Sequence, residues 1–181
     1  MKRNIIALVM MLCSAVFGFA QRSETAVCGI KMGTEKSVAK KMLQERFGYA
    51  SVSDDAGDIF VFNGSAGGIK HKFMTFQFVW IDGSARFNGA IFSTPFELSE
   101  QKEAIKNREY LKSLYEQKYI LREYKNDDGF KCYCFGESIL DGLGIVNLGV
   151  IEIHKAKGND GKSRLYLDVA YFGSYDETDD I

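Results

Sequence analysis

Two cysteines separated by one residue are the first side chains in this sequence whose spacing points to chemistry. Cys132 and Cys134 lie in a stretch typical of a β-strand, where residues two apart point to the same face. Two such thiols could ligate a metal, but a zinc site needs about four ligands. They could form a redox pair, although reactive thiols usually lie at a helix start that stabilises the thiolate. We therefore interpret both as small core side chains, with a disulfide from Cys28 to Cys132 or Cys134 as the main alternative.

An acid and a base share one face of a second predicted strand. Glu152 and His154 should lie across a hairpin from Arg164, Tyr166 or Asp168. A histidine beside a carboxylate can act as a general base, so Glu152, His154 and Asp168 define a small hydrolase as one hypothesis. The sequence places no serine, cysteine or lysine nucleophile beside them. Alternating charges on an exposed strand are more simply explained as a cross-strand ladder.

Two further segments have the composition of ligand-binding loops without the required arrangement. The glycine-rich segment 64–68 joins two predicted strands, whereas phosphate-binding loops open a helix. The acidic segments 54–55 and 126–129 lack the alternate acidic positions and the closing glutamate of a calcium loop, so they predict turns. We therefore expect no metal and no cofactor.

The elements that must position these residues follow a regular order. Predicted helices cover 34–47 and 99–117, and Arg108 should lie at the margin of the second with its head in water. Met74, Phe76, Phe78 and Trp80 alternate onto one face of a strand, which predicts a sheet covered on one side only. Thr94-Pro95 should break the sheet. The predicted strands are 26–31, 59–62, 72–81, 85–93, 119–124, 130–135, 145–154 and 164–172.

The middle of the chain repeats itself at an offset of 72 residues. In this register 54–64 lies over 126–136 and Cys132 and Cys134 fall opposite Phe60 and Phe62. We expect tandem α-β-β-β-β repeats, at about 26–94 and 95–174, within one domain spanning 21–174. Antiparallel strands beside one layer of helices predict a two-layer α+β fold, a long antiparallel sheet with two helices on one face.

This order of elements resembles two known tandem-repeat folds. It is similar to the β-lactamase inhibitory protein-like fold and to the TATA-box-binding-protein-like fold, and the resemblance implies a fold without implying site residues. A second resemblance rests on Gly33-Thr34, Val38 and Leu43. It is to the start of small outer-membrane-assembly lipoproteins, which would imply an envelope-assembly accessory protein.

The ends of the chain predict export. Residues 1–20 have the basic start, the apolar run and the small final residues of a signal peptide, with cleavage near Ala20-Gln21. The apolar run is shorter than the roughly 20 residues that span a bilayer. We expect a periplasmic or extracellular protein without a transmembrane segment after cleavage, ending in an acidic tail over 175–181.

Charge and composition favour a binding role. The formal net charge is −1 and no basic stripe is present, so nucleic acid is not an expected partner. We expect a non-catalytic binding module for a protein or a small-molecule ligand, because tyrosine and arginine on an open sheet face have the composition of an interface. The candidate binding residues are Arg86, Asn88, Tyr124, Glu152, His154, Arg164, Tyr166 and Asp168.

Overall fold

A computed structural model describes residues 26–136, 138–140, 144–158 and 160–173. The predicted signal peptide and acidic tail lie outside these residues. In chain order the elements are β1 (Ala26–Val27), β2 (Ile30–Lys31), α2 (Lys36–Phe47), η1 (Tyr49–Ser51), β3 (Val52–Asp55), β4 (Asp58–Ala66), β5 (Ile69–Ile81), β6 (Ser84–Phe96), η2 (Leu98–Glu100), α3 (Gln101–Tyr115), β7 (Leu121–Lys125), β8 (Lys131–Phe135), β9 (Ser138–Leu140), β10 (Gly144–Val146), β11 (Gly149–Lys157) and β12 (Ser163–Phe172). Within the described ranges, no helix is long and apolar enough to cross a membrane.

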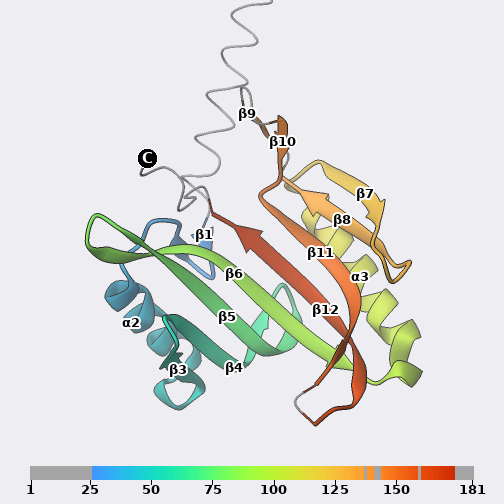
Figure 1. The fold of residues 1–181 in the computed structure, drawn as a ribbon, viewed down its shortest axis with the longest axis horizontal. Coiled ribbons are helices and arrows are strands. Elements are labelled where there is room, and N and C mark those ends of the chain that lie inside the picture. Colours follow the sequence, from blue (N-terminus) through green and yellow to red (C-terminus); the bar gives the residue numbers. More distant parts are fainter. Residues whose placement is uncertain (1–25, 137, 141–143, 159, 174–181) are drawn as a thin grey trace, which may run out of the picture.

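An antiparallel sheet of eight strands forms one layer of the molecule. Its order is β3-β4-β5-β6-β12-β11-β8-β7, and both helices pack behind it (Figure 1). Helix α2 contacts β3, β4 and β6, whereas α3 contacts β11 and β12. The predicted two-layer α+β class is therefore confirmed. Neither of these two helices packs on the other face of the sheet.

The two halves of the sheet are arranged alike: β3-β4-β5-β6 run inward from one edge and β7-β8-β11-β12 from the other. Each helix precedes an outer hairpin, and the last strands of the two halves, β6 and β12, pair at the centre. At the offset of 72, Gly57 (φ 92°) lies over Gly129 (φ 78°), and both occupy the turns of the outer hairpins. This arrangement is compatible with tandem repeats, whose duplication stays a prediction.

The core lies between the helices and alternate residues of the strands. Ile59, Val61, Met74 and Phe76 are fully buried there, as are Ile151 and Ile153 on the other half of the sheet. Rings from neighbouring strands meet within this layer, with Phe76 and Phe92 centroids 5.7 Å apart. Removing such side chains from water is the dominant favourable term in folding.

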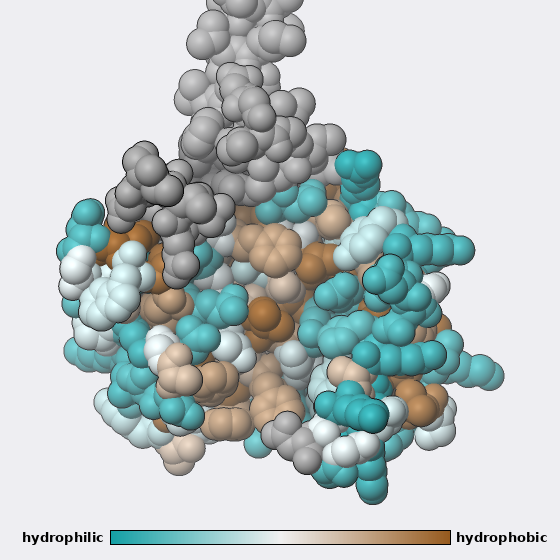
Figure 2. Space-filling view, in the orientation of Figure 1, coloured by the Kyte–Doolittle hydropathy of each residue, from teal (hydrophilic) through white to brown (hydrophobic). Residues whose placement is uncertain are grey.

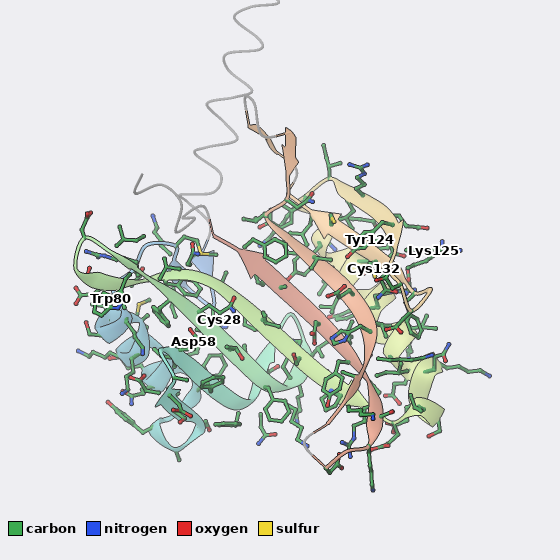
Figure 3. All side chains as sticks on the ribbon, viewed as in Figure 1. Cys28, Asp58, Trp80, Tyr124, Lys125 and Cys132 are labelled. Carbon is green, nitrogen blue, oxygen red and sulfur yellow. The ribbon has the colours of Figure 1, made fainter. Side chains whose placement is uncertain are left out.

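The predicted core position of Trp80 is wrong, because 75% of its side chain is exposed. Helix α2 begins at Lys36, whose Nζ lies 5.7 Å from the centroid of Phe78. Trp80 is two residues further along β5, beside the turn at the tip of the hairpin, where no helix covers it (Figure 3). Alternation predicted the correct face but could not show where the covering helix starts.

Pro95 does not break the sheet as predicted. It lies within β6 and pairs in register with Tyr166 of β12. The pairing of β6 with β5 has already ended at the Ser93–Phe73 pair, so one edge of β6 has no strand partner at Pro95. A strand tolerates proline at an unpaired edge, because the missing N–H costs no hydrogen bond to a neighbouring strand there.

The predicted solvent-exposed head of Arg108 is also wrong, because the residue is 5% exposed. Its Nη1 donates to the Lys131 carbonyl oxygen at 2.7 Å, and its Nε and Nη2 donate to Glu109 Oε1 at 3.0 and 2.6 Å. The guanidinium lies 5.6 Å from the centroid of Tyr133. A buried charge is tolerated when it is paired and hydrogen-bonded in this way.

Candidate functional site

The open face of the sheet brings together the predicted residues of β11 and β12. The register pairs Glu152 with Asp168 and His154 with Tyr166, and the alternation of the strands places all four on this face, together with Arg164. Tyr124 joins them from β7, paired with Cys132. Neighbouring side chains of a strand point to opposite faces, so the residues between them face the core.

Two predicted residues lie far from this group. Arg86 and Asn88 are on β6 near the β5–β6 hairpin, and Arg86 forms a bridge with Glu35 before α2. Tyr166 pairs with Pro95 at the other end of β6. At about 3.3 Å per residue, the nine steps from Arg86 to Pro95 correspond to roughly 30 Å. Arg86 and Asn88 therefore lie at the opposite end of β6 from Arg164 and Tyr166.

His154 and Asp168 form the most chemically suggestive pair on the open face. Nε2 of His154 lies 3.0 Å from Oδ2 of Asp168, and the imidazole stacks on Tyr166 with centroids 5.7 Å apart at 22°. The hydrogen bond with Asp168 raises the pKa of His154, and partial burial opposes this shift. The pair thus stabilises the protonated form of the imidazole.

The surroundings of the pair do not form a serine-type catalytic arrangement. In the register of β6 and β12, Ser93 pairs with Asp168, so the carboxylate lies between the hydroxyl and His154. A nucleophilic serine needs the imidazole beside its hydroxyl, with the carboxylate behind the imidazole. The geometry therefore gives little support to the hydrolase hypothesis.

Apolar side chains fill the middle of the open face. Phe62, Phe73 and Phe172 remain 42%, 38% and 45% exposed, and the rings of Phe62 and Phe73 meet edge to face at 6.2 Å. Figure 2 shows apolar residues gathered over the central strands between hydrophilic margins. We call Phe60, Phe62, Phe73, Ile91 and Phe172 the apolar strip.

The repeat did not predict the apolar strip, because it places Phe60 and Phe62 opposite two cysteines that were interpreted as core side chains. The signal was present, since Ile59, Phe60, Val61 and Phe62 are all apolar and a strand buried on one face only should alternate. Ile59 and Val61 face the core, which leaves the two phenylalanines on the open face.

Cys132 and Cys134 lie on the open face and not in the core beneath the helices. Tyr133 between them faces α3, where its hydroxyl donates to Glu109 at 3.0 Å. Cys132 is nonetheless fully buried, and its thiol lies 3.6 Å from the Phe130 carbonyl oxygen. Their counterparts in the repeat, Phe60 and Phe62, also face outward. The predicted burial is confirmed for Cys132, whereas Cys134 is only half-buried.

The alternative disulfide is not formed, since none of Cys28, Cys132 and Cys134 takes part in an S–S bond. Cys28 packs against the core on the helix side, where burial raises its pKa to about 11. The sheet lies between Cys28 and the other two thiols, and a disulfide requires Cα atoms within about 7 Å. Among the described residues, no group of three or more His, Cys, Asp or Glu side chains is placed to hold a metal ion.

A pocket of about 290 Å³ opens at one end of the open face. Its rings come from Phe73, Pro95 and Tyr166, and Arg164 and Lys72 supply its charges. Arg164 is held in place by Asp160, at 2.7 Å, and by Glu97, at 3.0 Å. The pocket therefore combines an apolar floor with a fixed polar rim, and we call it the end pocket.

No protein-family model, no curated protein and no solved structure matches this chain. The candidate site consequently rests on the geometry of the open face alone.

Proposed function

We propose that this protein is a non-catalytic binding module that holds a protein partner on the open face of its sheet. The observation that carries the proposal is the apolar strip, whose phenylalanines Phe62, Phe73 and Phe172 stay exposed on the face opposite α2 and α3. Exposed apolar surface rimmed by polar residues is characteristic of interaction sites.

The dimensions of the face suit a protein partner. Eight strands about 4.8 Å apart span roughly 35 Å, and about six residues of each strand cover roughly 20 Å. The product, roughly 700 Å², is close to the surface of about 800 Å² that each partner contributes to a standard interface. A small ligand would leave most of the apolar strip in water.

The polar rim is already organised before a partner arrives. Asp168 holds His154, while Asp160 and Glu97 hold Arg164, so these side chains lose little further rotational freedom on binding. The end pocket adds a recess beside the strip that fits one anchoring side chain. Interfaces concentrate their binding energy in such desolvated pockets near aromatic residues.

We also propose that the module acts outside the cytoplasm and belongs with the tandem-repeat folds named above. The signal-peptide pattern of residues 1–20 supports export, and the symmetric strand order supports the fold resemblance. Mass spectrometry of the protein from its native cells should find an N-terminus at Gln21, and an N-terminus at Met1 would contradict export.

Site-specific photo-crosslinking tests the binding face. A photoreactive phenylalanine analogue replaces Phe62, Phe73 or, as a control, the 80% exposed Ile120, which precedes β7 and lies outside the sheet. Irradiation of native cells should give the same adduct from positions 62 and 73 and none from position 120. The double variant Phe62→Asp, Phe73→Asp should lose the partner without a change in melting temperature.

Two results would contradict the proposal. Equal adducts from all three positions would show unspecific contact, and their absence from positions 62 and 73 would show that the face binds no protein. A hydrolytic activity found by substrate screening and abolished by His154→Ala, with the fold intact, would favour the hydrolase hypothesis instead.

A further inference from the structure

A second cavity lies on the opposite, helix-covered side of the sheet and has no part in the proposed binding face. Its volume is about 350 Å³, within the range of ligand pockets. The central strands β6 and β12 supply its floor and α3 one wall, while Ala26 and the β4–β5 turn lie on other sides. The residues that the argument uses are Phe92, Val169 and Tyr171 on the floor and Leu111, Leu114 and Tyr115 on the wall.

The cavity follows from the number of helices in the fold. Two helices cover eight strands, and α2 and α3 pack on different halves of the sheet. The strip over the central pair β6–β12 is therefore covered by side chains from α3 and from the β4–β5 turn, where Gly67 approaches Leu111 and Leu114. The cavity is the space that remains between α3 and the β4–β5 turn, where a third helix could have packed.

The polar groups inside this cavity already have partners. His71 is 1% exposed, its Nδ1 lies 3.1 Å from Thr94 Oγ1, and its Nε2 lies 3.3 Å from the Ala66 carbonyl oxygen. The hydroxyls of Tyr115 and Tyr171 hydrogen-bond to each other. Burial lowers the pKa of His71 and raises that of both tyrosines, so all three are neutral near pH 7. The interior consequently suits an apolar group.

The mouth of the cavity has a different character. Gln117 and Lys118 line it and are both exposed, so they mark its side toward water. Gln117 donates to the Ser113 carbonyl oxygen at 3.3 Å. No described carboxylate lies within ion-pair distance of Lys118. An ammonium at the mouth of an apolar cavity selects a ligand with an anionic end.

We propose that this cavity binds a small amphipathic monocarboxylate of the fatty-acid class. Its alkyl chain lies among Phe92, Leu114 and Val169, and its carboxylate remains at the mouth beside Lys118. This polarity follows from the neutral, hydrogen-bonded interior and the Lys118 ammonium at the mouth. The inference is independent of the proposed function, because it concerns the other side of the sheet.

Calorimetric titration with decanoate and decylamine, both below their critical micelle concentrations, tests the proposal. The two probes share an alkyl chain and differ in the charge of the head. We expect one decanoate per chain and at least tenfold weaker binding of decylamine. Lys118→Gln should weaken decanoate binding about two- to fivefold, because one exposed charge pair is lost, and should leave decylamine binding no weaker.

A pair of matched variants locates the ligand. Leu114→Trp fills the cavity and should abolish decanoate binding, whereas Leu98→Trp places the same side chain at a 49% exposed position outside the cavity and should bind normally. Phe62→Asp on the open face should also bind normally. If Leu114→Trp fails to fold, the preference for decanoate over decylamine and its reduction in Lys118→Gln still test the proposal.

Three results would overturn the proposal. These are no decanoate binding to the unaltered protein, equal binding of decanoate and decylamine, and unchanged decanoate binding in a folded Leu114→Trp variant. None of them bears on the photo-crosslinking result, so failure of this site and failure of the binding face are distinguishable.

Discussion

Arg108→Met should destabilise the protein by about 2–3 kcal/mol, because the buried guanidinium connects α3 to β8. The substitution keeps most of the aliphatic stem and removes the head. Removing the head eliminates the 2.7 Å hydrogen bond to the Lys131 carbonyl oxygen and the ion pair with Glu109. The stacking of the guanidinium on Tyr133 is lost as well.

The expected loss in free energy of unfolding is estimated from each of these contacts in turn. A hydrogen bond from a charged donor contributes about 1.5–3 kcal/mol. The ion pair contributes less, about 0–1 kcal/mol, because the Glu109 side chain is 44% exposed and therefore screened by water. Arg108→Ala removes two further buried methylenes, at about 0.8 kcal/mol each, and should cost about 4 kcal/mol in total.

Urea unfolding followed by circular dichroism measures both variants against the unaltered protein. We expect a lower midpoint with an unchanged m-value, which marks a change in stability and not in the unfolded state. Equal or greater stability of Arg108→Met would refute the reasoning, because apolar replacement of a buried ion pair is neutral or stabilising in some proteins. The polar contacts of Arg108 would then fix the position of α3 without stabilising it.

The same variant has a pH signature. Partial burial alone would raise the pKa of Glu109, but hydrogen bonds from Arg108 and Tyr133 outweigh it and hold the pKa below its ordinary value. A depressed pKa contributes stability above the unfolded-state pKa of about 4.3, and this contribution disappears as pH falls through the folded-state value. The stability gap between the unaltered protein and Arg108→Met should therefore narrow below about pH 4.

Two further predictions concern the strands of the sheet. The hydrogen bond with Asp168 raises the pKa of His154, so this pair stabilises the fold fully below about pH 6.5 and less as pH rises through the folded-state pKa. Urea unfolding at pH 5.5 and 8.5 should therefore show that Asp168→Asn loses more stability at the lower pH. An equal loss of stability at both pH values would contradict this prediction. Gly149→Ala should cost about 1–3 kcal/mol or more by thermal unfolding, because a Cβ there would lie 2.1 Å from the Ala170 carbonyl oxygen and 2.4 Å from Phe135; an unchanged melting temperature would show that the strands separate easily.

Periodicity was sufficient to predict the class of fold and most of its elements. The predicted helices 34–47 and 99–117 correspond to α2 and α3, and the alternation of Met74 and Phe76 identified the covered face correctly. These features are local, because a helix or a strand repeats its pattern within a few residues. The pairing of β6 with β12 at the centre joins residues about 70 positions apart, and no local pattern contains it.

The misjudged residues depend on partners that are distant in the sequence. Arg108 can be buried because a carbonyl oxygen 23 positions later accepts a hydrogen bond from it, which a helical charge pattern cannot reveal. Cys132 and Cys134 were assigned through the repeat, which aligns strands correctly but does not say which face of each strand the helices cover. The exposure of Trp80 could not be predicted either, because it depends on the position at which α2 begins.

One strand supplies both proposed binding sites, which makes them experimentally separable. Along β12, Tyr166 and Asp168 point to the open face, whereas Val169 and Tyr171 line the cavity beneath the helices. Because side chains alternate, a substitution on one face leaves the backbone ladder and the other face in place. A one-residue slip of β12 would exchange the two sets, so both proposed sites depend on the observed register of β11 and β12. The same pairing therefore supports the interface proposed on one side of the sheet and the ligand cavity proposed on the other.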